Sequence, residues 1–198
     1  QSNTTGQNNT AVGSGALATN TTASSNVAVG QLSLNANSTG QYNTAIGVNV
    51  LYSNTTANHN TAVGYSALLS NTTGYSNVAV GAYALDAVTT ANSCTAVGHA
   101  SLTSNTASTN TAVGWQCMYS NTSGTHNTAV GANALFANTT GNYNIAIGNY
   151  ALDANLSSEY NTAIGYAALS ANTAGYNTAV GYAALDVCST VHNNTAVG

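Results

Sequence analysis

The sequence contains no Lys, no Arg and no Pro, and it has only four acids. Charged residues make up 2% of the chain and the formal net charge is −4, whereas about a quarter of an ordinary domain is charged. Without cations the chain cannot neutralise phosphates, so we expect no nucleic-acid binding and no attraction to an anionic membrane. No apolar run approaches the roughly 18 residues of a membrane span, so we expect no membrane insertion.

Large apolar side chains are also scarce, with one Phe, one Trp and one Met. Even so, 43% of the residues are hydrophobic, which argues against disorder, because disordered chains combine low hydrophobicity with high net charge. The composition therefore predicts a fold that buries many small side chains in a regular pattern.

That pattern is a repeat. A motif ending in Ala-Val-Gly or Ala-Ile-Gly recurs twelve times, with its glycines 17 residues apart nine times and 16 apart twice. Self-similarity at a fixed period indicates a solenoid. The repeat glycines are Gly13, Gly30, Gly47, Gly64, Gly81, Gly98, Gly114, Gly131, Gly148, Gly165, Gly181 and Gly198.

Each repeat divides into a strand, a glycine turn, an Ala-Leu segment and a long turn. The β-branched residue before Ala-Val favours a short strand, and 17 residues are too few for a pair of helices. We predict an all-β fold, a parallel β-solenoid (β-roll) of about twelve 17-residue coils in which residues 1–198 form a single repeat array. Both 16-residue repeats lose their residue in the long turn, so we expect this turn outside and the Ala-Val and Ala-Leu pieces inside.

Adjacent strand residues face opposite ways, yet both Ala and Val are apolar in every copy. A strand that is apolar on both faces is usually covered on both. We predict that one face points into the coil and that the other, lined with Ala, contacts another copy of the chain. The alternative is that Ala only fits a cramped corner of a narrow coil.

The motif Asn-Thr-Ala-Val/Ile-Gly-x-x-Ala-Leu, at residues 60–68 and 161–169, resembles repeats of bacterial and phage-type surface fibres. It is similar, more loosely, to the head repeats of trimeric autotransporter adhesins, which have shorter repeats without the Asn-Thr-Thr-Gly turn. The resemblance implies left-handed parallel β-rolls that associate as trimers on the outside of the cell.

The groups that usually perform chemistry do not converge. We predict no catalytic residue, no cofactor and no metal site, because acids at defined spacing and closely spaced His or Cys are both missing. The acids are Asp86, Asp153, Asp186 and Glu159, and the histidines are His59, His99, His126 and His192.

The three cysteines occupy three different positions of the repeat, at Cys94, Cys117 and Cys188. A disulfide needs Cα atoms within about 7 Å, so we expect no intrachain bond. The odd number leaves intermolecular pairing open.

Two Asn columns run through the repeats. We expect the column before the strand to form a hydrogen-bonded ladder from coil to coil, as in cross-β assemblies. The column in the long turn heads Asn-x-Ser/Thr sequons, which mark candidate glycan acceptors on exposed turns; the alternative is that Asn and Thr simply suit turns. These candidates are Asn3, Asn20, Asn37, Asn54, Asn71, Asn121, Asn138 and Asn155, and two further sequons begin at Asn8 and Asn193.

We therefore expect a structural or adhesive segment of an extracellular fibre, part of a longer array, that displays an Asn/Thr-rich surface. Its expected partners are further copies of itself, as a trimer or a head-to-tail filament, and glycans or a surface receptor. The alternative is a carbohydrate- or ice-contacting solenoid that uses Thr/Asn ladders. Against it, the Thr-Thr pairs lie in a turn of variable length, and the strand Thr position also admits Val and Ile. Tyrosines such as Tyr65, Tyr166 and Tyr182 suit stacking on sugars or are scattered surface residues.

Overall fold

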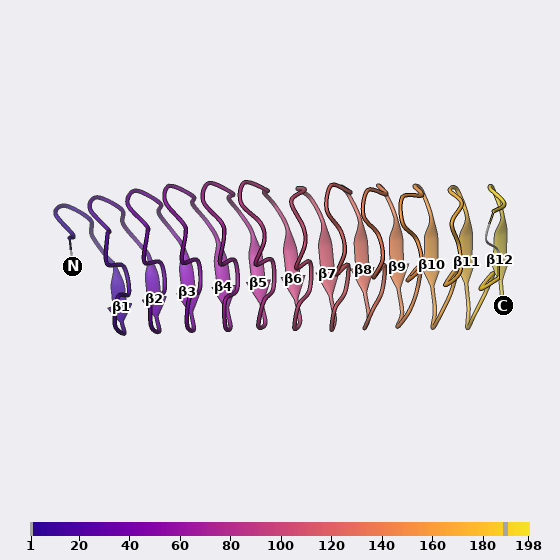
Figure 1. The fold of residues 1–198 in the computed structure, drawn as a ribbon, viewed down its shortest axis with the longest axis horizontal. Coiled ribbons are helices and arrows are strands. Elements are labelled where there is room, and N and C mark those ends of the chain that lie inside the picture. The colour runs from indigo at the N-terminus through magenta and orange to yellow at the C-terminus, as the bar shows by residue number, and fades with distance from the viewer. Residues whose placement is uncertain (1, 188–189) are drawn as a thin grey trace. The chain divides into compact units, whose positions relative to one another are not determined.

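The computed structural model describes residues 2–187 and 190–198. Within them the secondary structure is all-β, with no helix and with twelve strands of three residues each (Figure 1). The strands are β1 (Thr10–Val12), β2 (Val27–Val29), β3 (Thr44–Ile46), β4 (Thr61–Val63), β5 (Val78–Val80), β6 (Thr95–Val97), β7 (Thr111–Val113), β8 (Thr128–Val130), β9 (Ile145–Ile147), β10 (Thr162–Ile164), β11 (Thr178–Val180) and β12 (Thr195–Val197).

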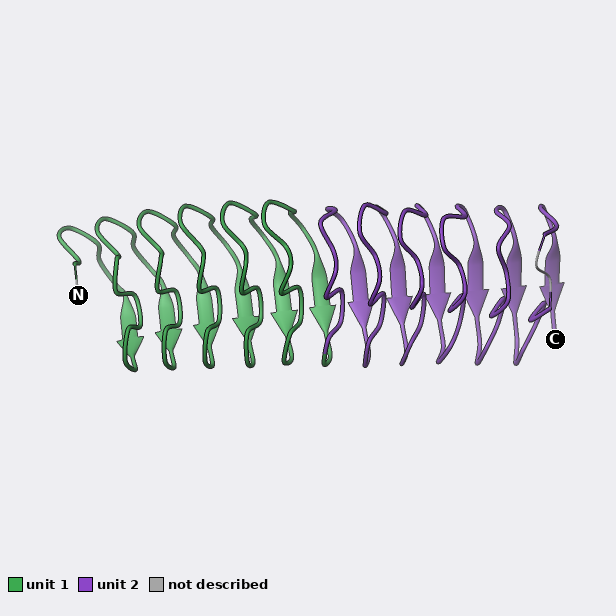
Figure 2. Cartoon of the chain, viewed as in Figure 1, with its two compact units in different colours: residues 1–99 green, residues 100–198 purple. Residues whose placement is uncertain are grey.

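The chain forms two compact units, Gln1–His99 with strands β1 to β6 and Ala100–Gly198 with strands β7 to β12 (Figure 2). Inside each unit every strand pairs in parallel with the next strand of the chain. The register advances by one repeat, so that Ala28 faces Ala45 in unit 1 and Ala163 faces Ala179 in unit 2. The predicted parallel β-solenoid with a strand in each of twelve coils is confirmed.

The repeat glycine ends each strand for two reasons. Gly64 has a φ of +138°, a conformation that other residues rarely adopt. A Cβ at this position would also lie 2.6 Å from the carbonyl oxygen of Gly81 in the next coil. The coils therefore approach one another closely at this turn, and no side chain fits between them.

Three positions of a typical coil hold non-glycine residues with positive φ. One of them is the Leu or Met four residues after the repeat glycine, where Leu68 has a φ of 51° and Leu152 a φ of 52°. The left-handed conformation costs roughly 1–2 kcal/mol for a residue with a side chain. Here it turns the leucine into the coil, where both side chains are fully buried, and that burial contributes about 1.5–3 kcal/mol. The predicted inward Ala-Leu segment is thus confirmed.

The two 16-residue repeats differ from the others in the long turn, as predicted. In a 17-residue coil the Asn54 Nδ2 donates to the carbonyl of Ala57, three residues ahead, at 3.2 Å. In the shorter coil the Asn105 Nδ2 donates to the carbonyl of Ala107, two residues ahead, at 2.6 Å. Both versions satisfy the Nδ2 of the turn asparagine, although Asn155 Oδ1 and Asn161 Nδ2, in the coil before the second shorter turn, have no hydrogen-bond partner.

Among the described residues there is no helix with the length and apolar character needed to cross a membrane.

Candidate functional site

The strand alanines point into the coil, and the prediction that their column contacts another copy is wrong. Ala45, Ala62 and Ala163 are all completely buried. Strand side chains alternate between the two faces, so the residues on either side of each alanine must face outward. The alternative, that Ala fits the narrow interior, is confirmed.

The first and third residues of every strand form what we call the outer strand face. The first is Thr in nine strands and Val or Ile in the other three, and the third is always Val or Ile. Ile46 and Ile147 are 40% and 39% exposed, and Thr61 is exposed as well. Because the strands pair in register, each unit carries a Thr-rich row beside a row of Val and Ile, with a spacing of about 4.8 Å between coils. The prediction that the Ala-Val piece is wholly inside is therefore wrong for Val.

The Asn column of the long turn is not the exposed row that the sequons suggest. Asn71 is fully buried, and its Nδ2 donates to Asn54 Oδ1 at 3.0 Å and to the carbonyl of Gly74 at 3.0 Å. A glycan bonded to this nitrogen would displace both hydrogen bonds and would have no space. The predicted exposure is wrong for Asn20, Asn37, Asn54, Asn71, Asn121, Asn138 and Asn155, which are all buried.

Three sequon asparagines are exposed. Asn3 begins the long-turn column in the first coil, where its Oδ1 accepts a hydrogen bond from Asn20 Nδ2 at 3.0 Å and its Nδ2 donates to the Gly6 carbonyl at 2.9 Å. Asn8 and Asn193 are exposed too. Glycosylation stays a prediction, and burial favours these three positions over the rest of the sequons.

The Asn column before the strand connects the coils, as predicted, but through the backbone. Asn60 Oδ1 accepts a hydrogen bond from the Asn77 backbone N–H at 2.9 Å. Its Nδ2 donates to the carbonyl of Gly74 at 2.9 Å. Side chain to side chain hydrogen bonds also occur in this column, from Asn43 Nδ2 to Asn26 Oδ1 at 3.2 Å and from Asn194 Nδ2 to Asn177 Oδ1 at 3.0 Å. Longer runs of such bonds occur in the long-turn column.

The acids are dispersed over both units. Asp86 belongs to unit 1, and Asp153, Asp186 and Glu159 belong to unit 2. Burial raises the pKa of Asp86 and of Asp153, and hydrogen bonds from backbone N–H groups offset part of that rise. No group of three His, Cys, Asp or Glu side chains in the described part of the chain could hold a metal ion.

The cysteines in the described residues are buried. Cys94 lies in unit 1 and Cys117 in unit 2. Burial raises the pKa of the Cys117 thiol to about 12, so it stays protonated and unreactive near neutral pH. Cys188 lies outside the described residues.

Many of the aromatic side chains pack on a ring of a neighbouring coil. In unit 2, four rings from successive coils stack almost in parallel, with centroids 4.9, 5.1 and 5.0 Å apart. This stack consists of His126, Tyr143, Tyr160 and Tyr176. Stacking follows from the repeat, because residues at equal positions of adjacent coils lie one strand spacing apart.

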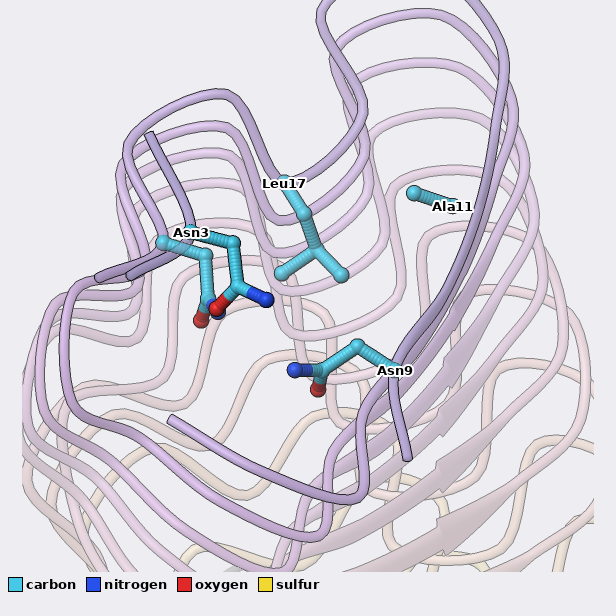
Figure 3. A pocket seen from close by; sticks show the side chains of 5 residues that line it. Asn3, Asn9, Ala11 and Leu17 are labelled. Carbon is cyan, nitrogen blue, oxygen red and sulfur yellow. The ribbon is translucent and has the colours of Figure 1, made fainter. Parts of the chain in front are cut away.

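A hollow of about 220 Å³ lies at the first coil, lined by Ala11, Leu17 and three asparagines (Figure 3). Figure 3 shows Asn3, Asn9 and Leu17 directed into it from different parts of the coil. These belong to the columns that pack between coils elsewhere in unit 1. We interpret the hollow as the open interior of a coil and not as a ligand site.

No protein-family model matches the chain. Comparison with curated proteins and with solved structures likewise gave no match. The fold defines a parallel β-solenoid, and its function must be inferred from the surfaces described above.

Proposed function

We propose that the chain is a structural segment of an extracellular fibre and that copies of it associate side by side through the outer strand face. The observation that supports this most is the row of exposed Val and Ile on the strands of each unit. A continuous apolar row without charge on a water-exposed sheet is typical of an interaction surface. The resemblance to surface-fibre repeats favours an extracellular location and three associated chains.

A non-catalytic role accords with the dispersed acids and the protonated Cys117 thiol. The buried amide ladders and the in-register strands make each unit suitable for holding a surface at a fixed spacing. Such a fibre supplies length and repeated contacts, while partners are recognised by the outward side chains.

Native mass measured by light scattering at micromolar concentration tests lateral association. We compare the unmodified chain with a variant carrying Ile46→Lys and Ile147→Lys on the outer strand face. Thr39→Lys with Thr140→Lys, at exposed turn positions, adds the same charge elsewhere. We expect an oligomer for the unmodified chain and the turn variant and a single chain for the face variant. A single-chain mass for the unmodified protein would overturn the proposal.

Ice contact is the second candidate, and the structure removes one objection to it. Thr occupies the first position of nine strands on the outer strand face and is not confined to the variable turn. Parallel rows of hydroxyl and methyl groups at about 4.8 Å suit an ordered layer of water. The Val and Ile residues in the Thr row still interrupt the hydroxyl array.

Both candidates use the same surface, so a covered face cannot also contact ice. A chain that is single in solution, shows thermal hysteresis, and loses it in Thr61→Tyr but not in Thr39→Tyr would favour the ice function. An oligomer without thermal hysteresis would favour the fibre.

A further inference from the structure

The only Trp and the only Phe of the chain lie together in unit 2, in a groove of about 300 Å³. We call it the aromatic groove, and its lining residues are Trp115, Gln116, Asn133, Phe136, Tyr150 and Asp153. Trp115 is 51% exposed and Tyr150 41% exposed. The groove therefore presents aromatic surface to solvent together with two amides and one carboxyl group.

Two columns of the solenoid form its length. Gln116, Asn133 and Tyr150 each lie two residues after a repeat glycine, with φ of 49°, 55° and 60°. Phe136 and Asp153 each lie five residues after one. Three adjacent coils about 4.8 Å apart thus supply the first column of the lining, and two of these coils supply the second.

The Phe136 ring is covered on one side. It stacks on Tyr119 of the preceding coil, with ring centroids 5.4 Å apart and planes 12° from parallel. The next residue of its column is Asp153, which has a short side chain and no ring. An apolar face of Phe136 is therefore available beside a carboxyl group.

We propose that the aromatic groove binds a neutral saccharide. A pyranose ring presents apolar C–H groups on its faces and hydroxyl groups around its edge. The faces match the rings of Trp115, Phe136 and Tyr150, and the hydroxyls match the donors and acceptors of Gln116, Asn133 and Asp153. An acidic sugar is disfavoured, because the chain has no Lys or Arg and Asp153 would repel an anion.

A quaternary ammonium ion is the main competitor, because aromatic rings beside an acid also attract cations. The quaternary nitrogen of such an ion carries no N–H to donate to Gln116 or Asn133. The mixed lining therefore favours the saccharide. The groove lies outside the strands, so its function is independent of whether the outer strand face associates or contacts ice.

Trp115 is the only tryptophan, so its fluorescence reports directly on the groove. The full chain is titrated with cellohexaose, maltohexaose, mannohexaose and chitohexaose, each up to about 10 mM, a range that detects weak binding. Choline chloride is titrated in parallel as a quaternary ammonium probe. We expect a saturable change of Trp115 emission with at least one hexasaccharide and none with choline.

Variants locate the site. Phe136→Ala and Gln116→Ala should each weaken the saccharide response by about tenfold, as loss of a central contact commonly does. Tyr65→Ala is the matched control, because Tyr65 occupies the repeat position of Trp115 but lies in unit 1. It should bind as the unmodified chain does. Thermal unfolding checks that each variant is folded. If Phe136→Ala does not fold, Gln116→Ala alone tests the site.

Three results would overturn the proposal. They are a flat Trp115 response to all four hexasaccharides, a saturable response to choline in place of sugar, and a saccharide response unchanged in a folded Phe136→Ala or Gln116→Ala variant. None of these depends on the oligomeric state, so failure of the groove and failure of the fibre can be told apart.

Discussion

A leucine with a positive φ is uncommon in proteins, and this chain has one at the same position of most repeats, four residues after the repeat glycine. Leu68, with a φ of 51°, is completely buried. The side chain fills the coil only because the facing strand residue is alanine. The strained backbone and the small strand residue thus depend on each other, and neither can be enlarged alone.

We predict that Ala62→Leu lowers the free energy of unfolding by about 1–3 kcal/mol, because the added methylenes have no space. Ala62 has no exposed surface. Tyr65→Ala, at a side chain that is 48% exposed and only edge-packed on Tyr83, should cost under about 1 kcal/mol. Urea unfolding measures both, and equal losses would contradict the inward orientation of the alanine.

The amide ladder predicts a strong difference between two Asn→Asp substitutions. Asn54 Nδ2 donates to Asn37 Oδ1 at 2.9 Å and to the carbonyl of Ala57 at 3.2 Å. In Asn54→Asp an oxygen faces both acceptors, so we expect a loss of about 3 kcal/mol. Burial would hold the pKa of this new carboxyl above its usual range, so part of the loss should be recovered as the pH falls through that pKa.

Asn58→Asp is the control, because its exposed Oδ1 accepts the Gln41 backbone N–H at 2.6 Å and a carboxylate preserves that role. It should change stability by under about 1 kcal/mol. Chemical unfolding at acidic and neutral pH compares the two variants. Similar losses at neutral pH would show that the long-turn ladder contributes little.

At the scale of the coil, the glycine turn fixes how closely neighbours approach. We predict that Gly64→Ala costs about 3 kcal/mol or more, from backbone strain together with a collision 2.6 Å from the Gly81 carbonyl oxygen. Gly15 also has a positive φ, but there the nearest atom to an added Cβ is the flexible end of Leu32. Gly15→Ala should cost only about 1–2 kcal/mol. Thermal unfolding compares the two variants. A smaller loss of stability in Gly64→Ala than in Gly15→Ala would be incompatible with this packing.

Insertions should be tolerated in the long turn and not in the strand. One Thr added after Thr106 restores the length of the other coils, so stability should change by under about 1 kcal/mol. One Thr added between Thr61 and Ala62 reverses the facing of the residues that follow and should unfold that coil. Circular dichroism and urea unfolding compare the two insertions; equal effects would exclude the assignment of the long turn to the surface.

Much of the coil could be predicted from sequence because its determinants are local. The glycine spacing gave the repeat, and the missing residue before Asn110 located the variable turn. The facing of Ala62 and Val63 could not be assigned, because both are apolar and alternation alone does not say which one is inside. The burial of Asn54 was missed for a similar reason: Asn suits both an exposed turn and a ladder of buried amides.

At the scale of the whole chain, the absence of Lys and Arg makes stability depend little on ion pairs. Burial raises the pKa of Asp86, so its folded form holds a proton more tightly than its unfolded form. The contribution of Asp86 to stability is therefore present at low pH and is lost as the pH rises through the raised pKa. We predict that Asp86→Asn is slightly more stable than the unmodified chain at neutral pH, within about 0.5 kcal/mol for this half-exposed group.

The difference between Asp86→Asn and the unmodified chain should shrink as the pH falls through that pKa, because the protonated acid and the amide are both neutral. Urea unfolding across this pH range measures it. A difference that grows on acidification would contradict the cause assigned to the pKa shift.

The aromatic groove could not be predicted from the sequence, because Trp115, Phe136 and Tyr150 come from different repeats and different repeat positions. Their proximity depends on the path of the chain between each glycine and the following Leu or Met. A signal was present, since the single Trp and single Phe occur within little more than one repeat of each other. The closeness of these two residues in the sequence indicates a shared groove only once the stacking of the coils is known.

The in-register hydrogen bonds have a consequence for how such a gene can change. The long-turn asparagines of adjacent coils bond to one another in nearly the same way, as Asn54 does to Asn37 and Asn71 does to Asn54. Recombination that adds or removes one repeat of codons would therefore rejoin compatible coils wherever both neighbouring coils keep the ladder asparagine, whereas Asn71 Oδ1, followed in its column by Val88, is unpaired. Length can then evolve in whole-coil steps, each adding about 4.8 Å, independently of the residues that face solvent.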